Sequence, residues 1–275
     1  MNPDTIRVIL SLLQICMLGF IIIRVSRKAH YGKTSVITVF FIYGIICLLI
    51  SDMYWLVHGL LRPDVRLPFS VNEVGEMGTD LLFASMLAAV FKDRFLKPGF
   101  ETICAAIFAV AIAALWVGWT GEWVKDILSG IVFGYYTCVT VRAMRCSEAF
   151  TFMEWLILSL SAYILIAVQG LIFAVDDEIG KMLDVFCYII MFSVMIWLVQ
   201  KATRAAIAAH RIKDLKTSEK SVALSFFTMV WIMNTMYMSS EPMYFFGFFV
   251  FSLILPVMMI SVFGMESVKG KEDCT

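Results

Sequence analysis

Nine runs of apolar residues, each close to the length of a bilayer-spanning helix, constrain the fold of this chain more than any other feature. A helix needs about 20 mainly apolar residues to cross the hydrocarbon core of a membrane. Of the 275 residues, 61% are hydrophobic and 16% are charged, whereas soluble domains average about 45–50% and about 25%. We therefore predict an all-α, polytopic transmembrane helix bundle of about nine spans. The runs cover 5–23, 35–61, 71–91, 102–119, 124–141, 149–175, 182–199, 222–238 and 243–263.

The distribution of Lys and Arg predicts how the bundle is oriented. Basic residues concentrate in the cytoplasmic segments of membrane proteins. With the N-terminus outside, 17 of the 22 Lys and Arg residues fall in the inner segments. We therefore expect an outer N-terminus, a cytoplasmic C-terminus and a plasma membrane of bacterial type. Seven or eight spans are the alternative if the run 222–238 re-enters the membrane. The five basic residues left outside are Arg7, Arg62, Arg66, Lys125 and Lys181.

The runs follow one another without a soluble domain between them. We expect a single transmembrane helical domain, 1–265, and a short polar cytoplasmic tail, 266–275. The segment 200–221 is basic and rich in Ala, which predicts a cytoplasmic helical loop. It either extends the seventh span or lies on the membrane surface. This segment is the candidate contact for a cytoplasmic protein partner.

The stretch from Asp52 to Asp80 joins the second apolar run to the third and gathers charged and aromatic side chains at one membrane boundary. Ser70 and Glu73 match a capping box, in which each side chain bonds the backbone amide of the other residue. We therefore predict that a helix begins near Ser70. On that helix the spacing of Glu73, Glu76 and Asp80 places all three on one face.

The preceding helix carries a matching group. Asp52 and Trp55 share a face by their spacing, and His58 lies beside them. Asp52 and Asp80 each lie a helical turn or more inside an apolar run. Ionisable groups inside a membrane are costly, and they indicate functional sites.

Most intramembrane polar residues are predicted in the outer half of the spans, whereas the inner half contains Glu154 and some Ser and Thr. This asymmetry indicates an outward-facing polar pocket. The outer group contains Asp52, Glu76, Asp80, Asp126, Gln169, Asp184 and Asn234. The candidate ligand-binding residues are Asp52, Trp55, His58, Glu76, Asp80 and Asn234.

A purely structural explanation of these residues is also open. Glu73 would then only cap its helix, and Glu76 would pair with Arg62 or Arg66 at the headgroups. Trp55 would be an interfacial aromatic residue. A carboxylate suits the positive end of a helix dipole, which would explain Asp126 and Asp184 if each lies within a turn of its span's start.

Motifs of familiar catalytic chemistry are missing from the sequence. It contains no H-E-x-x-H, no G-x-S-x-G, no Glu-Glu pair on a span and no His cluster. We therefore name no catalytic residue and expect no cofactor. A metal site would require Asp52, His58 and Glu76 to converge, and none is predicted. The net charge is zero and no basic face is present, so the expected partners are the lipid bilayer and a small polar ligand, without nucleic acid.

The residues Asp52 to Trp55, followed by Glu76 to Leu82, resemble part of a known architecture. It is the multi-span N-terminal membrane segment that precedes diguanylate cyclase and histidine kinase domains in bacteria. The resemblance covers about an eighth of the chain. No cyclase or kinase domain follows Met265, so the resemblance implies a sensor segment that signals through a partner.

Three functions are compatible with the sequence. The first is a stand-alone sensor or regulatory membrane protein with an outward-facing polar pocket. The second is a secondary transporter or permease that uses Asp52, Asp80 and Glu154 as a proton path. The third is an outward-facing membrane enzyme that acts on lipid or cell-wall precursors with paired carboxylates.

Overall fold

The computed structural model describes residues 3–31, 35–61, 71–92, 99–120, 122–172, 174–236 and 241–272. These residues form nine α-helices and no strand, which confirms the all-α class. Each helix contains most or all of one predicted apolar run. The helices are α1 (Pro3–Tyr31), α2 (Val36–Leu61), α3 (Val71–Val90), α4 (Phe100–Thr120), α5 (Trp123–Cys146), α6 (Phe152–Ile172), α7 (Asp177–Ile212), α8 (Leu215–Met236) and α9 (Glu241–Glu272).

Seven of these helices are long and apolar enough to cross a membrane, namely α1, α2, α4, α5, α6, α7 and α9. The other two carry more polar side chains. Helix α3 contains Glu73, Glu76 and Asp80, and α8 contains Glu219 and Asn234 among several Ser and Thr residues. The number of spans, nine or seven, therefore stays a prediction.

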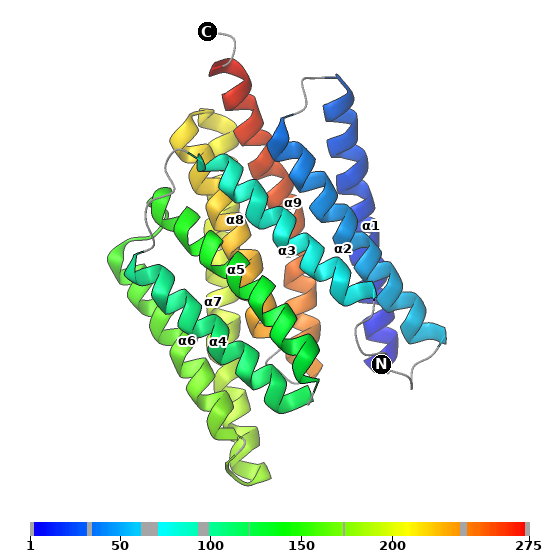
Figure 1. Cartoon of the computed structure of the whole chain (residues 1–275), viewed down its shortest axis with the longest axis vertical. Helices are drawn as coiled ribbons and strands as arrows, with labels where there is room; N and C mark the ends of the chain where they lie inside the picture. Colours follow the sequence, from blue (N-terminus) through cyan, green and yellow to red (C-terminus); the bar gives the residue numbers. More distant parts are fainter. Residues whose placement is uncertain are drawn as a thin grey trace.

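Successive helices run in opposite directions (Figure 1). Helices α1, α3, α5, α7 and α9 begin at the end drawn at the bottom of Figure 1, which we call the lower end, and α9 finishes at the upper end.

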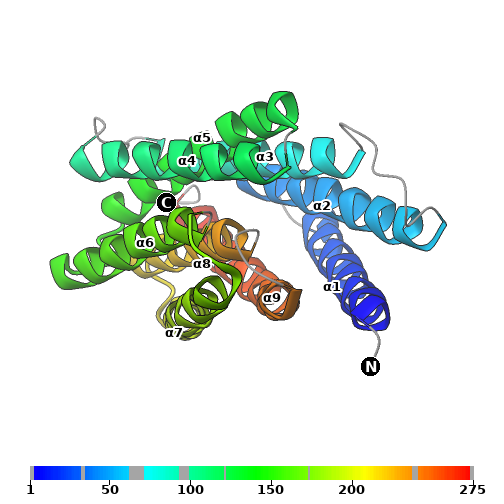
Figure 2. The ribbon, with the colours of Figure 1, turned by 90° about the horizontal axis from the view of Figure 1, so that it is seen from below.

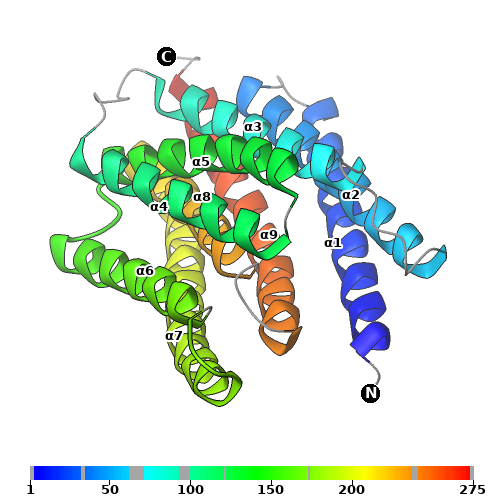
Figure 3. The same ribbon diagram turned by 60° about the horizontal axis from the view of Figure 1, so that its bottom comes forward.

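The helices pack in two layers. Helices α4, α5, α3 and α2 lie side by side in one layer (Figures 2 and 3), and each contacts the next. The second layer contains α6, α7, α8, α9 and α1, again joined by neighbouring contacts. Contacts of α1 with α2, of α5 with α8 and of α4 with α6 hold the layers together.

Helix α8 is the central helix of the bundle. It contacts α3, α5, α7 and α9, and every residue from Ser221 to Met236 is buried. A helix buried on all sides must satisfy its polar side chains within the protein. Thr228 and Thr235 do so by donating to carbonyls one turn back, Leu224 O at 2.7 Å and Trp231 O at 2.8 Å.

Small residues let α2 and α3 approach closely. A Cβ atom added at Gly75 would lie 2.8 Å from Cys47 O, and one added at Gly44 would overlap the Phe83 ring. Thr79 Oγ1 donates to Gly44 O at 3.1 Å across the same contact. Close approach at small residues is a common way for membrane helices to associate. This close contact places the acidic face of α2 next to the acidic face of α3.

The basic segment 200–221 is mainly helical. Residues 200–212 extend α7, which is one of the two predicted arrangements, and α8 begins at Leu215. Lys213 ends α7 with a left-handed backbone, φ 57°. Ala202, Ala206 and Ala209 are buried against the bundle, so this part of the segment packs on the protein. The boundary predicted between the transmembrane domain and the tail 266–275 does not end a helix, because α9 continues as far as Glu272.

Candidate functional site

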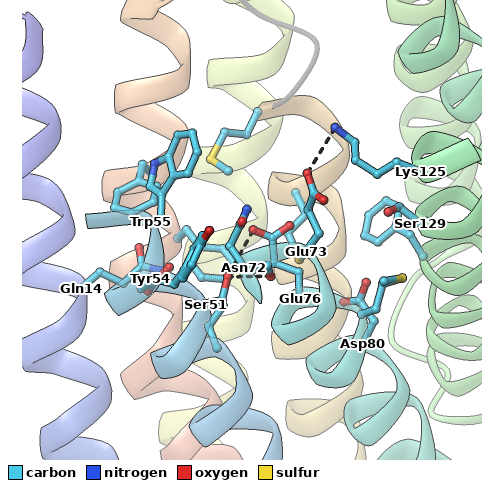
Figure 4. A pocket seen from close by; sticks show the side chains of 18 of the residues that line it. Gln14, Ser51, Tyr54, Trp55, Asn72, Glu73, Glu76, Asp80, Lys125 and Ser129 are labelled. Carbon is cyan, nitrogen blue, oxygen red and sulfur yellow. Dashed lines mark hydrogen bonds and ion pairs between the residues drawn. The ribbon is translucent and has the colours of Figure 1, made fainter. Parts of the chain in front are cut away.

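A cavity of ≈ 250 Å³, lined by both charged and apolar side chains, lies among the lower halves of the helices, and Figure 4 shows it from close by. It reaches the lower ends of α2, α3, α5 and α9, and Gln14 of α1 and Met233 of α8 also contribute to its wall. Its described lining residues are Gln14, Leu48, Ser51, Asp52, Tyr54, Trp55, His58, Asn72, Glu73, Glu76, Met77, Asp80, Trp116, Lys125, Asp126, Ser129, Phe133, Met233, Met236, Tyr244, Phe248 and Phe251.

Five of the six candidate residues line this cavity. Asp52, Trp55 and His58 come from α2, and Glu76 and Asp80 come from α3. Asp52 is 8% exposed and Asp80 is 4% exposed, whereas Trp55 is 36% exposed. The structure thus brings these five side chains together. Their binding of a ligand stays a prediction.

Asn234, the sixth candidate, lies elsewhere. It lines a second, mostly apolar cavity of ≈ 390 Å³ that is bounded by α4, α5, α6 and α8. Its Nδ2 donates to Val230 O at 2.9 Å, and its Oδ1 has no hydrogen-bond partner among the described residues. The prediction that it shares a pocket with Asp52 is wrong, because depth in the membrane does not determine which side of a fully buried helix a residue faces.

Hydrogen bonds and ring contacts organise the α2 side of the cavity. Ser51 Oγ donates to Asn72 O at 2.9 Å, which ties α2 to the first turn of α3, and it lies 3.5 Å from Glu76 Oε1. Tyr54 and His58 stack with ring centroids 5.7 Å apart. These contacts fix the side chains next to Asp52.

Asp52 is also held from α1. Ser252 Oγ of α9 donates to Gln14 Oε1 at 3.3 Å, and Gln14 donates a hydrogen bond to the Asp52 side chain. Gln14 is not among the predicted site residues. An isolated amide in an otherwise apolar run is the signal that could have identified it.

Glu73 forms an ion pair across the cavity. Its Oε1 lies 3.2 Å from Lys125 Nζ on α5, and both side chains are nearly buried, at 12% and 10% exposure. Lys125 also pairs with Glu122 and with Asp126, at 3.8 Å for the latter. Figure 4 shows this lysine reaching toward α3 from the opposite wall.

Three other sequence predictions concern charged groups around the cavity. Helix α3 begins at Val71, which confirms the predicted start near Ser70. Ser70 itself and the proposed partners Arg62 and Arg66 lie outside the described residues. Asp126 does lie in the first turn of α5.

Asp184 was predicted within a turn of the start of its span, and this is wrong, because α7 begins at Asp177. The helix dipole therefore does not explain its position. Gln169 Nε2 donates to Asp184 Oδ1 at 3.4 Å, outside the cavity.

Four buried rings, which we call the aromatic layer, lie on the upper side of the cavity. They are Phe41, Phe83, Tyr136 and Phe226, each 0% exposed. Phe83 contacts the other three, with centroids 5.9 Å from Phe41, 5.1 Å from Phe226 and 6.4 Å from Tyr136. Such ring pairs pack well in stacked and edge-to-face arrangements.

The position of these rings along their helices places them between the cavity and the upper end. Phe41 precedes the cavity residues of α2, which begins at the upper end, and Phe83 follows those of α3, which begins at the lower end. Tyr136 follows the cavity residues of α5, and Phe226 precedes those of α8. On all four helices the ring is therefore the next layer toward the upper end.

Glu154, the inner carboxylate of the predicted proton path, lies at the upper end of α6. It forms a capping box with Thr151, whose backbone N donates to Glu154 Oε2 at 2.8 Å while Glu154 N donates to Thr151 Oγ1 at 3.4 Å. It also forms an ion pair with Lys201 of α7. This capping box was not predicted, although Thr and Glu three residues apart before an apolar run are its signature.

No group of three or more His, Cys, Asp or Glu residues is placed to hold a metal ion within the described parts of the chain.

The seven apolar helices define an integral, multi-pass membrane protein. Comparison of the chain with protein-family models, with curated proteins and with solved structures gives no match.

Proposed function

We propose that this protein is a sensor or regulatory protein of the plasma membrane that binds a small polar ligand in the cavity at its lower end. The observation that carries the proposal is the combination of a polar cavity with the aromatic layer above it. A site that is polar on one side of the membrane and closed toward the other suits a receptor. Transporters instead place their sites near the midplane, with access from both sides in turn.

The basic residues support an outward-facing cavity. Arg24, Arg27 and Lys28 of α1 lie toward the upper end, as do Arg142 and Arg145 of α5. Further basic residues of α7 and α8 lie there too. Because cytoplasmic segments are rich in Lys and Arg, the upper end is the proposed cytoplasmic side, in a membrane of bacterial type.

Helix α8 offers a route for a signal. Its lower part contributes Met233 and Met236 to the cavity. Its upper part begins next to the exposed residues Arg211, Lys213 and Lys216, which are the proposed contact for a cytoplasmic partner. Ligand binding would bias the position of α8 and thereby the presentation of these basic residues. The resemblance of the Asp52–Leu87 stretch to bacterial sensor segments agrees with this role.

The transporter alternative has less support from the geometry. A proton path from Asp80 to Glu154 would have to pass the aromatic layer, and Glu154 is already engaged by Thr151 and Lys201.

The test compares binding with uptake. The purified chain in lipid nanodiscs is screened for small polar solutes that raise its Tm. Hydrogen exchange of residues 200–221 is then measured with and without each such solute. We expect a ligand to change exchange in this segment, and Asp52→Asn to abolish the change. Asp177→Asn, which removes an exposed carboxylate that does not line the cavity, should leave it intact. Uptake of the same solute by proteoliposomes would instead establish a transporter.

A further inference from the structure

The cavity at the lower end is lined by more acidic than basic side chains. Among its described lining residues, five carry a carboxylate, whereas Lys125 alone carries an ammonium or guanidinium group. That lysine is already shared by Glu73, Glu122 and Asp126. The five carboxylate residues are Asp52, Glu73, Glu76, Asp80 and Asp126.

Two buried carboxylate oxygens in this cavity have no hydrogen-bond partner among the described residues. They are Asp52 Oδ2 and Asp80 Oδ1. Buried polar atoms are nearly always satisfied, so each exception needs an explanation. A carboxylate oxygen accepts hydrogen bonds, and the partner that would satisfy both atoms is a ligand that carries N–H donors.

Aromatic side chains form much of the remaining wall. Trp55, Tyr54 and Tyr244 lie at or near the cavity's lower side, and Phe133 and Phe251 lie deeper. The face of an aromatic ring attracts a cation within about 6 Å of its centroid, and desolvation strengthens this attraction. Carboxylates together with aromatic rings favour an organic cation over an inorganic one, because the rings offer no ligand atoms to a metal ion.

The size of the cavity limits the ligand further. Its volume of ≈ 250 Å³ lies below the roughly 300–1,000 Å³ that is usual for drug-sized ligands. A ligand of this size would place its charged group at the aspartates and its body against the rings.

We propose that the ligand of this cavity is a small organic cation with N–H donors, a protonated amine or a guanidinium, whose charged group lies between Asp52 and Asp80. This inference rests on the proposed function and names the chemical class of the ligand that the receptor detects.

The test uses probes that differ in charge but share a body. The full-length protein in nanodiscs is titrated with 2-phenylethylamine and 1,4-diaminobutane, and binding is measured by calorimetry. The neutral probes are 2-phenylethanol and 1,4-butanediol, and the anionic probes are phenylacetate and succinate. Sodium chloride serves as the inorganic cation. We expect at least one amine to bind about tenfold or more tightly than its neutral and anionic counterparts.

Variants connect the binding to the two aspartates. Asp52→Asn and Asp80→Asn keep the shape of each side chain and remove its charge, so each should weaken amine binding by about tenfold or more. Asp177→Asn removes an exposed carboxylate outside the cavity and should not change the affinity. Because the asparagine variants remove no packing, their Tm without ligand reports whether they still fold.

The outcomes separate this inference from the proposed function. If neutral or anionic probes bind in the cavity and the amines do not, the cation inference is overturned and the receptor proposal survives. If amines bind and proteoliposomes accumulate them, the ligand class holds and the receptor proposal fails. If sodium alone binds, or no probe of any charge binds, the organic-cation inference is overturned. Equal amine affinity in the wild type and both aspartate variants would also overturn it.

Discussion

Lys125 is the residue on which the charge balance around the cavity most depends. Its ammonium group serves three carboxylates, Glu73, Glu122 and Asp126, and its side chain is 10% exposed. Lys125→Met would leave the nearly buried carboxylates of Glu73 and Asp126 without this cation, and loss of one partner of a buried ion pair destabilises a protein by roughly 3–5 kcal/mol. Glu73→Gln should cost less, because Lys125 keeps two partners. Thermal unfolding in nanodiscs measures both, and an equal or larger loss for Glu73→Gln would contradict this ranking.

Asp214 should make the start of α8 sensitive to acid. Its Oδ2 accepts from Thr217 N at 3.1 Å, and hydrogen bonds from the Thr217 side chain and backbone lower the pKa of the Asp214 carboxyl. The carboxylate therefore adds stability above the ordinary Asp pKa of about 3.9. This stability is lost as the pH falls through the lower pKa of the folded protein.

Two substitutions at this position separate charge from capping. Asn is as good a helix cap as Asp, whereas Ala costs about 1 kcal/mol. At neutral pH we expect Asp214→Asn to keep the Tm and Asp214→Ala to lower it. Between pH 5 and about pH 3, the wild type should lose more stability than Asp214→Asn. Parallel pH profiles for the two would show that the carboxylate has no such role.

Some of the cavity residues could be predicted from the sequence, because they lie near the end of one apolar run and the start of the next. Asp52, Glu76 and Asp80 lie close in sequence on two helices joined by one connection, so their convergence followed from helix spacing. Gln14 and Lys125 come from helices distant in the sequence, and only tertiary packing brings them to the same place.

Close packing at Gly75 should control the α2–α3 pair. A Cβ atom there would lie 2.8 Å from Cys47 O and 3.0 Å from Ser51 Cβ, so the helices would have to separate. Overpacking of this kind typically costs about 1–3 kcal/mol. We expect Gly75→Ala to lower the Tm and to disturb the Ser51–Asn72 hydrogen bond beside it.

The matched control lies on α2 at Gly59, where an added Cβ would meet no atom within 4 Å. Gly59→Ala should be neutral or slightly stabilising, because Ala is the better helix former. If both substitutions have the same effect on Tm, the glycine contact does not limit the approach of the two helices.

Helix α8 contains, beside the apolar cavity, two buried polar groups that are unsatisfied among the described residues, and one of them, the Asn234 amide, can be replaced by an apolar group. Asn234 Oδ1 and Trp231 Nε1 are buried beside the apolar cavity and have no hydrogen-bond partner in the described residues. Replacing an unsatisfied buried polar group with an apolar one of similar shape is often neutral or stabilising. We expect Asn234→Leu to keep or raise the Tm. A loss of several degrees would show that the amide has a partner that only the membrane-embedded protein provides.

The helices themselves were largely predictable, and the differences have simple causes. Apolar runs mark only the lipid-exposed or buried part of a helix. Helices α7 and α9 therefore continue beyond their runs, into the polar residues up to Ile212 and Glu272. Helix α8 was the shortest run because it is surrounded by protein rather than by lipid. There its Ser and Thr side chains bond its own backbone.

At the scale of the whole molecule, the aromatic layer lies between the cavity and the basic upper end on α2, α3, α5 and α8. Phe83 of α3 and Phe226 of α8 pack edge to face with centroids 5.1 Å apart, so they join the two helix layers. Under the proposed function, we expect ligand binding below this layer to move α8 as a rigid element without opening a water path. The separation of the two ends is thus a property of the bundle that can be measured directly.

Access of a membrane-impermeant thiol reagent tests this separation. Ser129 lines the cavity and is half-buried, and Lys213 is exposed at the upper end. In a background without natural cysteines, the thiol of Ser129→Cys should react with a charged methanethiosulfonate only from the outer side of the membrane. The thiol of Lys213→Cys should react only from the cytoplasmic side. Adding Phe83→Ala and Phe226→Ala removes two rings of the layer, so cytoplasmic reagent should then reach position 129. Reaction from the cytoplasmic side with the layer intact would mean that the cavity is open through the bundle, which would favour transport over sensing.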